Sequence, residues 1–220
     1  MTDLLDLFYD ELKNNIYKRC ISIGDYDDAG IGGESFETIV NETSTKLNHN
    51  TDWKKFSKNA EGFDQIIKDE KMSIKTVKKN KKATQITLTS YRLTECKESN
   101  DFLSEIEKRD KSYTKIFLML RECYTDKCEF TFFEIPVNFF KLSNEFEYRK
   151  TRKSMYCNLE NNKGTATISF SASNQLSFNI KKKDIIEFQT YQFIMFKNLI
   201  VELKEEIDLL IIKKLKKRNV

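Results

Sequence analysis

The spacing of apolar and polar residues divides the chain into segments with helical or strand periodicity. Apolar residues recur every three or four positions in three segments, which predicts amphipathic helices over residues 3–19, 34–47 and 101–108. Short apolar or alternating runs predict strands at residues 63–67, 72–77, 85–91, 115–121, 130–135, 165–172 and 175–180. From about Asp184 a broad apolar stripe predicts one long final helix, packed on its own core or forming a subunit interface. The pattern indicates a mixed α/β protein.

The first two strand segments hold the residues of greatest chemical interest. The polar link Lys68–Lys71 predicts a hairpin, and a four-residue loop would place Asp64 opposite Lys75 and Ile66 opposite Ser73. Side chains alternate along a strand, so Asp64, Ser73 and Lys75 would share one face while apolar residues cover the other. Such a pair could hold a metal ion over a phosphodiester, or it could be an ordinary cross-strand ion pair. A shift of one residue in the register would separate these side chains.

Length and composition set broad limits. The 220 residues suffice for one substantial core, and a net charge of +4 permits nucleic acid as a partner without requiring it. The N-terminal residues lack the signal-peptide pattern, and charged residues interrupt the apolar stretch at 193–212, so we expect no membrane segment. Five cysteines, an odd number without an export signal, favour reduced thiols in the cytoplasm.

Several kinds of catalytic and metal site are disfavoured by missing residues. His49 is the only histidine, which argues against an HNH nuclease, a histidine general base and a Ser-His-Asp hydrolase. A structural zinc site is disfavoured because the chain has no CxxC pair. Gly32-Gly33 lacks the glycine spacing and the lysine of a phosphate-binding loop.

The segment from Gly33 to Arg121 resembles the core of the PD-(D/E)xK nucleases, particularly the type II restriction endonucleases. Three features carry this resemblance: Gly33–Glu37 opening a helix before the sheet, Asp64 on one strand with Ser73-Ile74-Lys75 on the next, and a following strand, helix and strand. The resemblance implies a restriction-endonuclease-like α/β fold, with a central mixed β-sheet flanked by helices, an extra β-hairpin and a long C-terminal helix. It implies one nuclease domain over residues 1–220, with a core at about 33–121 and accessory elements at 141–220.

The resemblance also implies a site with four catalytic residues, Asp64, Ser73, Lys75 and Glu37. The expected cofactor is Mg2+, held by Asp64, Glu37 and the main-chain carbonyl of Ile74, because magnesium prefers oxygen ligands and keeps several waters. Lys75 would orient or deprotonate the attacking water and offset charge in the transition state.

Ser73 occupies the position where the family usually has an acidic residue. A helix carboxylate would replace the missing one, and Glu37 is the first candidate, followed by Glu105 and Glu34. A solvent-exposed helix glutamate is the ordinary alternative for Glu37.

The expected partners are double-stranded DNA and a second copy of the chain, because a twofold protein suits a short palindromic site. The candidate DNA-binding residues follow the second strand or end later ones: Lys78, Lys79, Ser90, Tyr91, Arg92 and Arg121. Restriction function implies a bacterial cytoplasmic protein. The alternatives are a structure-specific repair or recombination nuclease, a non-catalytic DNA-binding module of the same fold, and a protein-interaction domain with a basic surface.

Overall fold

The computed structural model describes residues 4–25, 31–47, 64–67, 70–93, 99–143, 146–149, 153–170 and 174–218. Within these ranges the helices are α1 (Leu4–Ile23), α2 (Glu34–Lys46), α3 (Ser99–Asp110) and α4 (Lys197–Arg218), with short 3-10 helices η2 (Val137–Phe140) and η4 (Lys182–Phe188). The structure confirms the three helices predicted before residue 110. No helix in these ranges is both long enough and apolar enough to cross a membrane.

Two five-stranded sheets form the centre of the molecule. Sheet A has the order β1 (Gln65–Ile67), β2 (Glu70–Lys79), β4 (Lys115–Cys123), β5 (Lys127–Pro136) and β10 (Gln189–Phe196). Sheet B has the order β3 (Gln85–Arg92), β9 (Gln175–Lys181), β8 (Gly164–Ser169), β7 (Ser154–Asn158) and β6 (Glu147–Arg149). In sheet A, β2 and β4 are parallel and the other neighbours are antiparallel, so the predicted mixed sheet and α/β class are confirmed.

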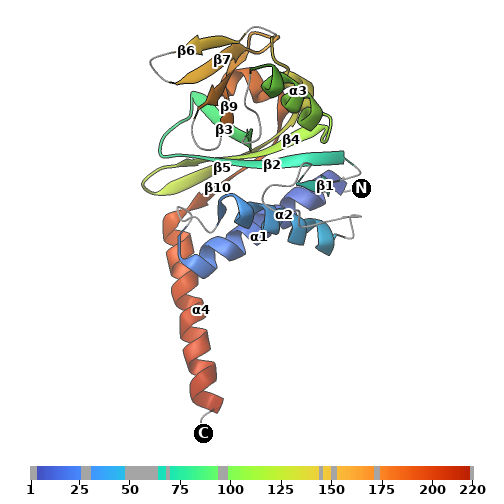
Figure 1. Cartoon of the computed structure of the whole chain (residues 1–220). Helices are drawn as coiled ribbons and strands as arrows, with labels where there is room; N and C mark the ends of the chain where they lie inside the picture. The colour runs from blue at the N-terminus through green and yellow to red at the C-terminus, as the bar shows by residue number, and fades with distance from the viewer. Residues whose placement is uncertain are drawn as a thin grey trace.

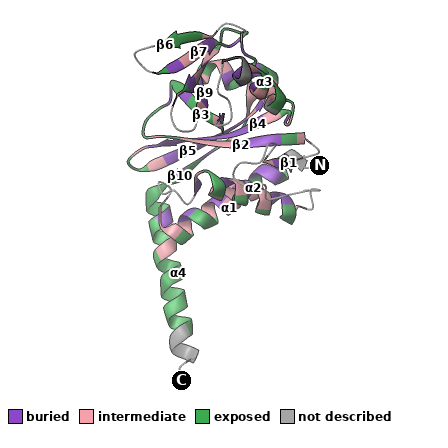
Figure 2. Ribbon diagram, in the orientation of Figure 1, coloured by how far each residue is buried: buried purple, intermediate pink, exposed green. Residues whose placement is uncertain are grey.

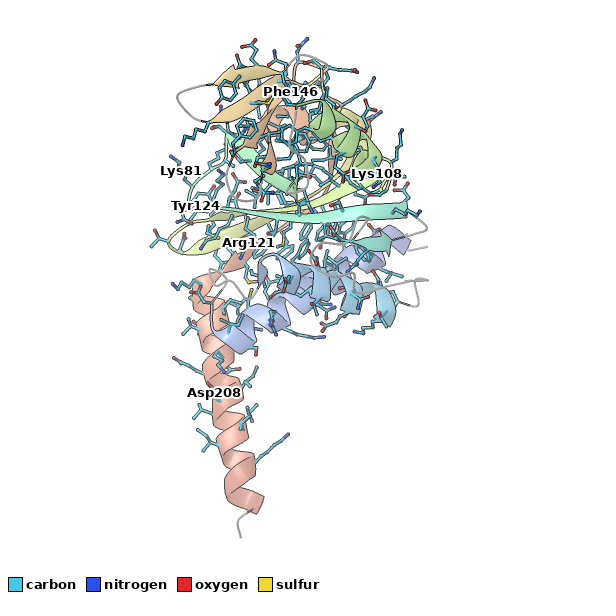
Figure 3. All side chains as sticks on the ribbon, in the orientation of Figure 1. Lys81, Lys108, Arg121, Tyr124, Phe146 and Asp208 are labelled. Carbon is cyan, nitrogen blue, oxygen red and sulfur yellow. The ribbon has the colours of Figure 1, made fainter. Side chains whose placement is uncertain are left out.

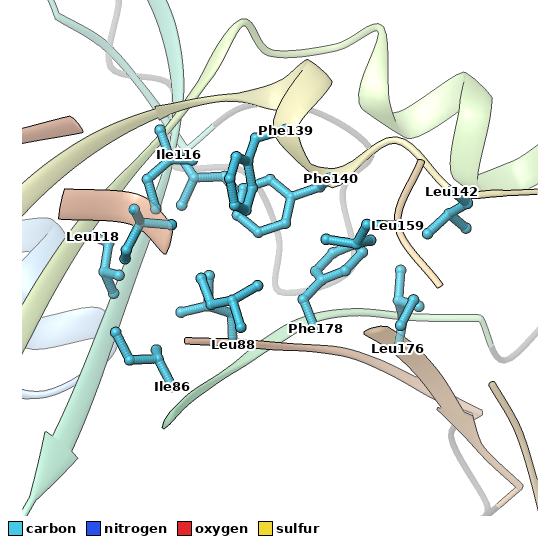
Figure 4. Packing of buried hydrophobic residues seen from close by; sticks show 14 of the residues in the cluster. Ile86, Leu88, Ile116, Leu118, Phe139, Phe140, Leu142, Leu159, Leu176 and Phe178 are labelled. Carbon is cyan, nitrogen blue, oxygen red and sulfur yellow. The ribbon is translucent and has the colours of Figure 1, made fainter. Parts of the chain in front are cut away.

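Sheet A lies between two layers, with α1 and α2 on one face and sheet B with α3 on the other (Figure 1). Side chains alternate between the two faces of β4, so this one strand contributes to the hydrophobic cores on both faces of sheet A. Phe117 and Met119 pack toward α1 and α2, whereas Ile116, Leu118 and Leu120 pack toward sheet B. Figure 4 shows the second of these cores, where side chains of β4, η2 and sheet B meet.

The predicted strand at 85–91 exists, but it does not continue the sheet formed by β1 and β2. It is β3, and it pairs with β9 in sheet B, where Ile86 and Leu88 are buried. The predicted hairpin at 165–180 is β8 and β9, so it belongs to that same sheet. Residues 141–220 are therefore not an appended unit, because they supply most of sheet B and also β10 of sheet A.

The predicted final helix from about Asp184 is wrong in its first third. Residues 189–196 form strand β10, which pairs with β5, and the helix begins only at Lys197. The side chains of Phe193 and Met195 point into the core beside α1, while Ile194 and Phe196 are exposed. Apolar residues occupy both faces of this segment, so its sequence fits helical and strand periods alike, and pairing with β5 decides between them.

The β1–β2 hairpin is shifted by two residues from the predicted register. The structure pairs Gln65 with Met72 and Ile67 with Glu70, which shortens the expected four-residue link to two residues. A shift of two residues preserves the alternation of side chains, so Asp64, Ser73 and Lys75 still share a face and Gln65, Met72 and Ile74 share the other, although the predicted cross-strand partners are wrong.

Candidate active site

Three residues of the second strand converge on the carboxylate of Asp64, which directly precedes β1. The Asp64 N–H donates to the Met72 carbonyl at 2.9 Å, which fixes the backbone at the edge of sheet A. Its Oδ2 accepts hydrogen bonds from the Ser73 hydroxyl at 3.0 Å, the Ile74 N–H at 2.6 Å and the Lys75 ammonium at 3.4 Å. The structure thus brings together the Asp64, Ser73 and Lys75 predicted from the sequence.

This cluster is reachable from solvent. The side chains of Asp64 and Lys75 are 30 % and 21 % exposed, whereas Ser73 is buried. Among the described residues, none donates a hydrogen bond to Oδ1 of Asp64. Lys75 also donates to the Ile74 carbonyl at 3.1 Å, so the predicted main-chain ligand lies beside the predicted catalytic lysine. The site therefore offers one carboxylate oxygen from Asp64, directly before β1, and one carbonyl and one ammonium from β2.

Glu37 of α2 lies close enough to this cluster to interact with it electrostatically. Burial raises the pKa of Glu37, and the neighbouring negative charge of Asp64 raises it further. Lys75 acts in the opposite direction and lowers this pKa, while Glu34 raises it. Of the three glutamates proposed as the replacement carboxylate, Glu34 is exposed on the same helix and Glu105 is half-buried on α3. Glu37 is therefore the helix carboxylate that the fold brings into the range of both Asp64 and Lys75.

Gln65 fixes α2 against β1, a role that the sequence analysis missed. Its side-chain Nε2 donates to the main-chain carbonyl of Glu37 at 2.6 Å, and the residue is buried. The sequence contains a signal for this role, because Gln65 is a polar residue on the apolar face of a short strand. A buried amide at such a position needs a hydrogen-bond partner.

Tyr113 is a second residue near the site that the sequence analysis did not identify. Its buried hydroxyl donates to Asp110 at 3.3 Å and hydrogen-bonds with Ser90, one of the predicted DNA-binding residues. Burial raises the pKa of Tyr113, and the charges of Asp110 and Asp64 act in the same direction. Tyr113 thus joins β3 to the end of α3 beside the Asp64 cluster.

Arg121 does not lie on a surface that DNA could reach. It is 4 % exposed, and its charge lowers the thiol pKa values of Cys20 and Cys128. The reason is its position on β4, because Phe117, Met119 and Arg121 alternate toward the layer formed by α1 and α2. The prediction that Arg121 contacts DNA is therefore wrong for this arrangement.

Of the remaining candidate DNA-binding residues, Lys78 and Lys79 lie toward the other end of sheet A, whereas Ser90, Tyr91 and Arg92 belong to β3 of sheet B. Lys78 is exposed and Lys79 is half-buried near the end of β2, and Figure 3 labels Lys81 at the end of this sheet opposite β1. Lys79 is four residues beyond Lys75, or about 13 Å along an extended strand. The side chains of Tyr91 and Arg92 fall outside those that the structure describes.

The donor set fits a hard divalent cation. Two carboxylates, Asp64 and Glu37, with the Ile74 carbonyl provide the oxygen ligands that Mg2+ prefers, and such ions commonly keep several waters. Among the described residues, no group of three or more histidine, cysteine, aspartate or glutamate side chains is arranged to hold a metal. Asp64, Glu37 and the Ile74 carbonyl are therefore the oxygen donors of this site that could hold a cation with few protein ligands.

Comparison of the chain with protein-family models, with curated proteins and with solved structures found no match.

Proposed function

We propose that the chain is a type II restriction endonuclease that hydrolyses phosphodiester bonds of double-stranded DNA at a short specific sequence, with Mg2+ as cofactor. The observation that supports this proposal is the contact between Asp64 and Lys75, at 3.4 Å, on partly exposed side chains at one edge of the mixed sheet. In this proposal α2, β1, β2, α3 and β4 form a restriction-endonuclease-like core. Strand β3 follows β2 in the chain but belongs to sheet B.

Each residue of the site has a definite role in this proposal. Asp64, Glu37 and the Ile74 carbonyl hold the cation, which when bound neutralises phosphate charge and makes a coordinated water more acidic. Lys75 orients the attacking water and offsets the charge that develops on the phosphate. The Ser73 hydroxyl and the Ile74 N–H hold the Asp64 carboxylate in one orientation through their hydrogen bonds to Oδ2.

The electrostatics of Glu37 support a cation at this position. Two carboxylates close together disfavour each other's ionised form, and the pKa of Glu37 is raised partly for that reason. Lys75 offsets only part of this repulsion. A divalent cation between the two carboxylates would offset more of it, so Asp64 and Glu37 together favour binding of such an ion.

A non-catalytic DNA-binding module is the second candidate function. One observation favours it: the Asp64 Oδ2 already accepts three hydrogen bonds from the protein, and the bond from the Ile74 N–H supports the edge of sheet A beyond β1. A carboxylate held in this way could be purely structural, and Ser73 in place of an acidic residue would then mark a site without chemistry.

Cleavage of large unmethylated phage DNA separates these candidates. The protein is incubated with Mg2+ or with chelator, beside Asp64→Asn, Lys75→Met and the control Lys71→Met, which changes an exposed lysine on the same strand. Discrete fragments that need Mg2+ and are lost only in the Asp64 and Lys75 variants would support the restriction enzyme. Cleavage that follows DNA structure would favour a repair or recombination nuclease. DNA binding without cleavage would favour the binding module, and no DNA binding at low salt would overturn all three.

A further inference from the structure

Helix α4 leaves the body of the molecule and presents apolar side chains to solvent. It projects beyond α1 in Figure 1, and Figure 2 colours most of its described length as exposed. Seven large apolar residues of this helix are between 39 % and 57 % exposed: Leu199, Val201, Ile207, Leu209, Leu210, Ile211 and Ile212. Isolated exposed apolar residues are normal on protein surfaces, but the exposed apolar run Ile207–Ile212, interrupted by Asp208 alone, marks an interaction surface on this projecting helix.

One face of α4 continues an apolar stripe that begins in the core. Ile200 is fully buried and Leu203 is half-buried where the helix meets the body. Ile207 and Leu210 follow at steps of four and three residues, so they lie on the same face, and there the body no longer covers them. The stripe therefore runs beyond the surface that this copy of the chain can bury.

The charges of α4 are separated along its length. Between Val201 and Leu209 the helix carries four carboxylates, at Glu202, Glu205, Glu206 and Asp208, and one cation, Lys204, which pairs with Asp208 at 3.0 Å. After Ile212 all of its charged residues are cations: Lys213, Lys214, Lys216, Lys217 and Arg218. Glu206 and Lys213 are seven residues apart, about two turns, so they border the apolar stripe on the same side.

We infer that α4 pairs with α4 of a second copy of the chain in an antiparallel arrangement. The twofold axis passes between Ile207 and Leu210, so that each Ile207 packs on Leu210 of the second copy. Glu206 then lies beside Lys213 of the second copy, and the twofold symmetry makes this ion pair twice. Both the apolar stripe and the separated charges are therefore self-complementary.

A parallel pairing does not suit the same helix. It would place the five cations at the end of one helix against the same five cations of the second copy, and it would oppose the carboxylates in the same way. Like charges at such positions disfavour the pairing, whereas the antiparallel arrangement places Glu206 beside Lys213 of the second copy and separates the two cationic ends. Charge complementarity thus indicates that α4 of a second copy, running antiparallel, covers this surface.

The interface is small, which sets the expected affinity. The paired region extends from Leu203 to Lys214, or about 18 Å of helix. Interfaces below about 1,200 Å² are typical of weak or transient complexes. We therefore expect a dissociation constant in the micromolar range, about 1–100 μM.

Sedimentation equilibrium of the full chain over a concentration series tests this inference. Replacing both Ile207 and Leu210 by Asp should weaken dimerisation by about 100-fold or more, because it buries charges at the centre of the interface. The matched control replaces Leu209 and Ile212 by Asp on the opposite side of the same helix, and it should change the affinity by no more than about threefold. Far-UV circular dichroism checks that each variant keeps its helix content.

Exchanging the charges of Glu206 and Lys213 provides an independent test of the antiparallel direction. Glu206→Lys and Lys213→Glu should each weaken dimerisation by about tenfold, and the double variant should recover to within about threefold of the original affinity. A monomer at about 100 μM, an equal effect of the control variant, or no recovery in the double variant would overturn the inference. Binding of the monomer to vesicles containing phosphatidylserine, without self-association, would also overturn it and assign the helix to a membrane surface. These measurements need neither DNA nor Mg2+, so their outcome does not depend on the proposed nuclease activity.

Discussion

Two carboxylate–lysine pairs lie at opposite ends of sheet A and differ in what surrounds them. Asp64 and Lys75 lie at one end of sheet A with partly exposed side chains, and only one oxygen of Asp64 accepts hydrogen bonds from described residues. Glu122 lies toward the other end, beside Lys79 in the β2–β4 register, and its side chain is 1 % exposed. Its Oε1 accepts the Ala83 N–H at 2.5 Å and its Oε2 accepts the ammonium of Lys182.

The comparison shows that the chemical type of a pair does not decide its role. Both oxygens of Glu122 are used: they join β4 to Ala83, two residues before β3, and to η4, so this carboxylate connects the segments that lead into sheet B and follow it. Asp64 is partly exposed, and its Oδ1 accepts no hydrogen bond from the part of the chain that the structure describes, so this oxygen can take an external ligand. Exposure and the use of both oxygens therefore distinguish a structural pair from a candidate functional one.

The largest expected effect is on the buried pair. Glu122→Ala should lower the free energy of unfolding by about 3–5 kcal/mol, because it leaves the Ala83 N–H and the Lys182 ammonium without their shared acceptor. Asp64→Asn should change it by less than about 1 kcal/mol, because an amide oxygen can still accept hydrogen bonds. Urea denaturation of both variants measures the difference. Equal destabilisation would remove the distinction between the two pairs.

Replacing the lysine of each pair should affect DNA cleavage in the opposite order: Lys75 should matter for activity and Lys182 should not. Lys75→Met should lower the rate of DNA cleavage by about 10²–10⁴-fold, because it removes the group that positions the attacking water. Its stability should change by less than about 1 kcal/mol, since the Asp64–Lys75 contact is partly exposed. Single-turnover cleavage at saturating protein measures the rate, and Lys182→Met is the matched control. The control should reduce stability while the remaining folded protein cleaves normally.

The pH dependence of stability sharpens the assignment of Glu37. The fold raises the pKa of Glu37, so its ionisation opposes folding above that raised pKa, and this cost disappears below the ordinary pKa of a glutamate. In chelator, Glu37→Gln should therefore melt higher than the original protein at pH 8, by roughly 1–4 °C, with the difference vanishing near pH 4. Thermal unfolding at both pH values measures this effect.

Added Mg2+ should reverse the order of the two proteins at pH 8. The original protein should be stabilised because the cation binds its folded state, and Glu37→Gln should gain less because it has lost one carboxylate ligand. The control is Glu34→Gln, one turn earlier on α2, which should respond to Mg2+ like the original protein. An unchanged response of Glu37→Gln would exclude Glu37 as a ligand.

The smallest expected effect concerns the lysines between the two pairs. Replacing Lys78 and Lys79 by Gln should weaken DNA binding and reduce the slope of log affinity against log salt by about 1–2, because each phosphate contact releases about one counterion. Fluorescence anisotropy with a short duplex in Ca2+, at several salt concentrations, measures the slope. Lys163→Gln is a suitable control because Lys163 pairs with Glu187 away from sheet A. An equal change in the control would show that general charge, and not this end of β2, accounts for binding.

Local patterns predicted most of the elements but not their partners. The amphipathic spacing of Phe36, Ile39 and Val40 predicted α2, and all three are buried as expected. The apolar run of β4 likewise predicted a buried strand, and β5 is its hairpin partner as expected. The choice of β9 as the neighbour of β3 involves residues about 90 positions apart, which no local pattern encodes. For the same reason the local pattern of β10 predicts helix, because its pairing with the distant strand β5 is not encoded in that segment.

The sequence by itself determined which side chains of β1 and β2 share a face, because strand alternation has a period of two and a shift of two residues leaves it unchanged. It therefore placed Asp64, Ser73 and Lys75 together despite the wrong register. Only the tertiary structure decided that Glu37 approaches them and that Arg121 is buried, because both follow from how α2 and α1 pack on sheet A. Burial and neighbouring charge are properties of packing between distant segments, and periodicity along one segment does not contain them.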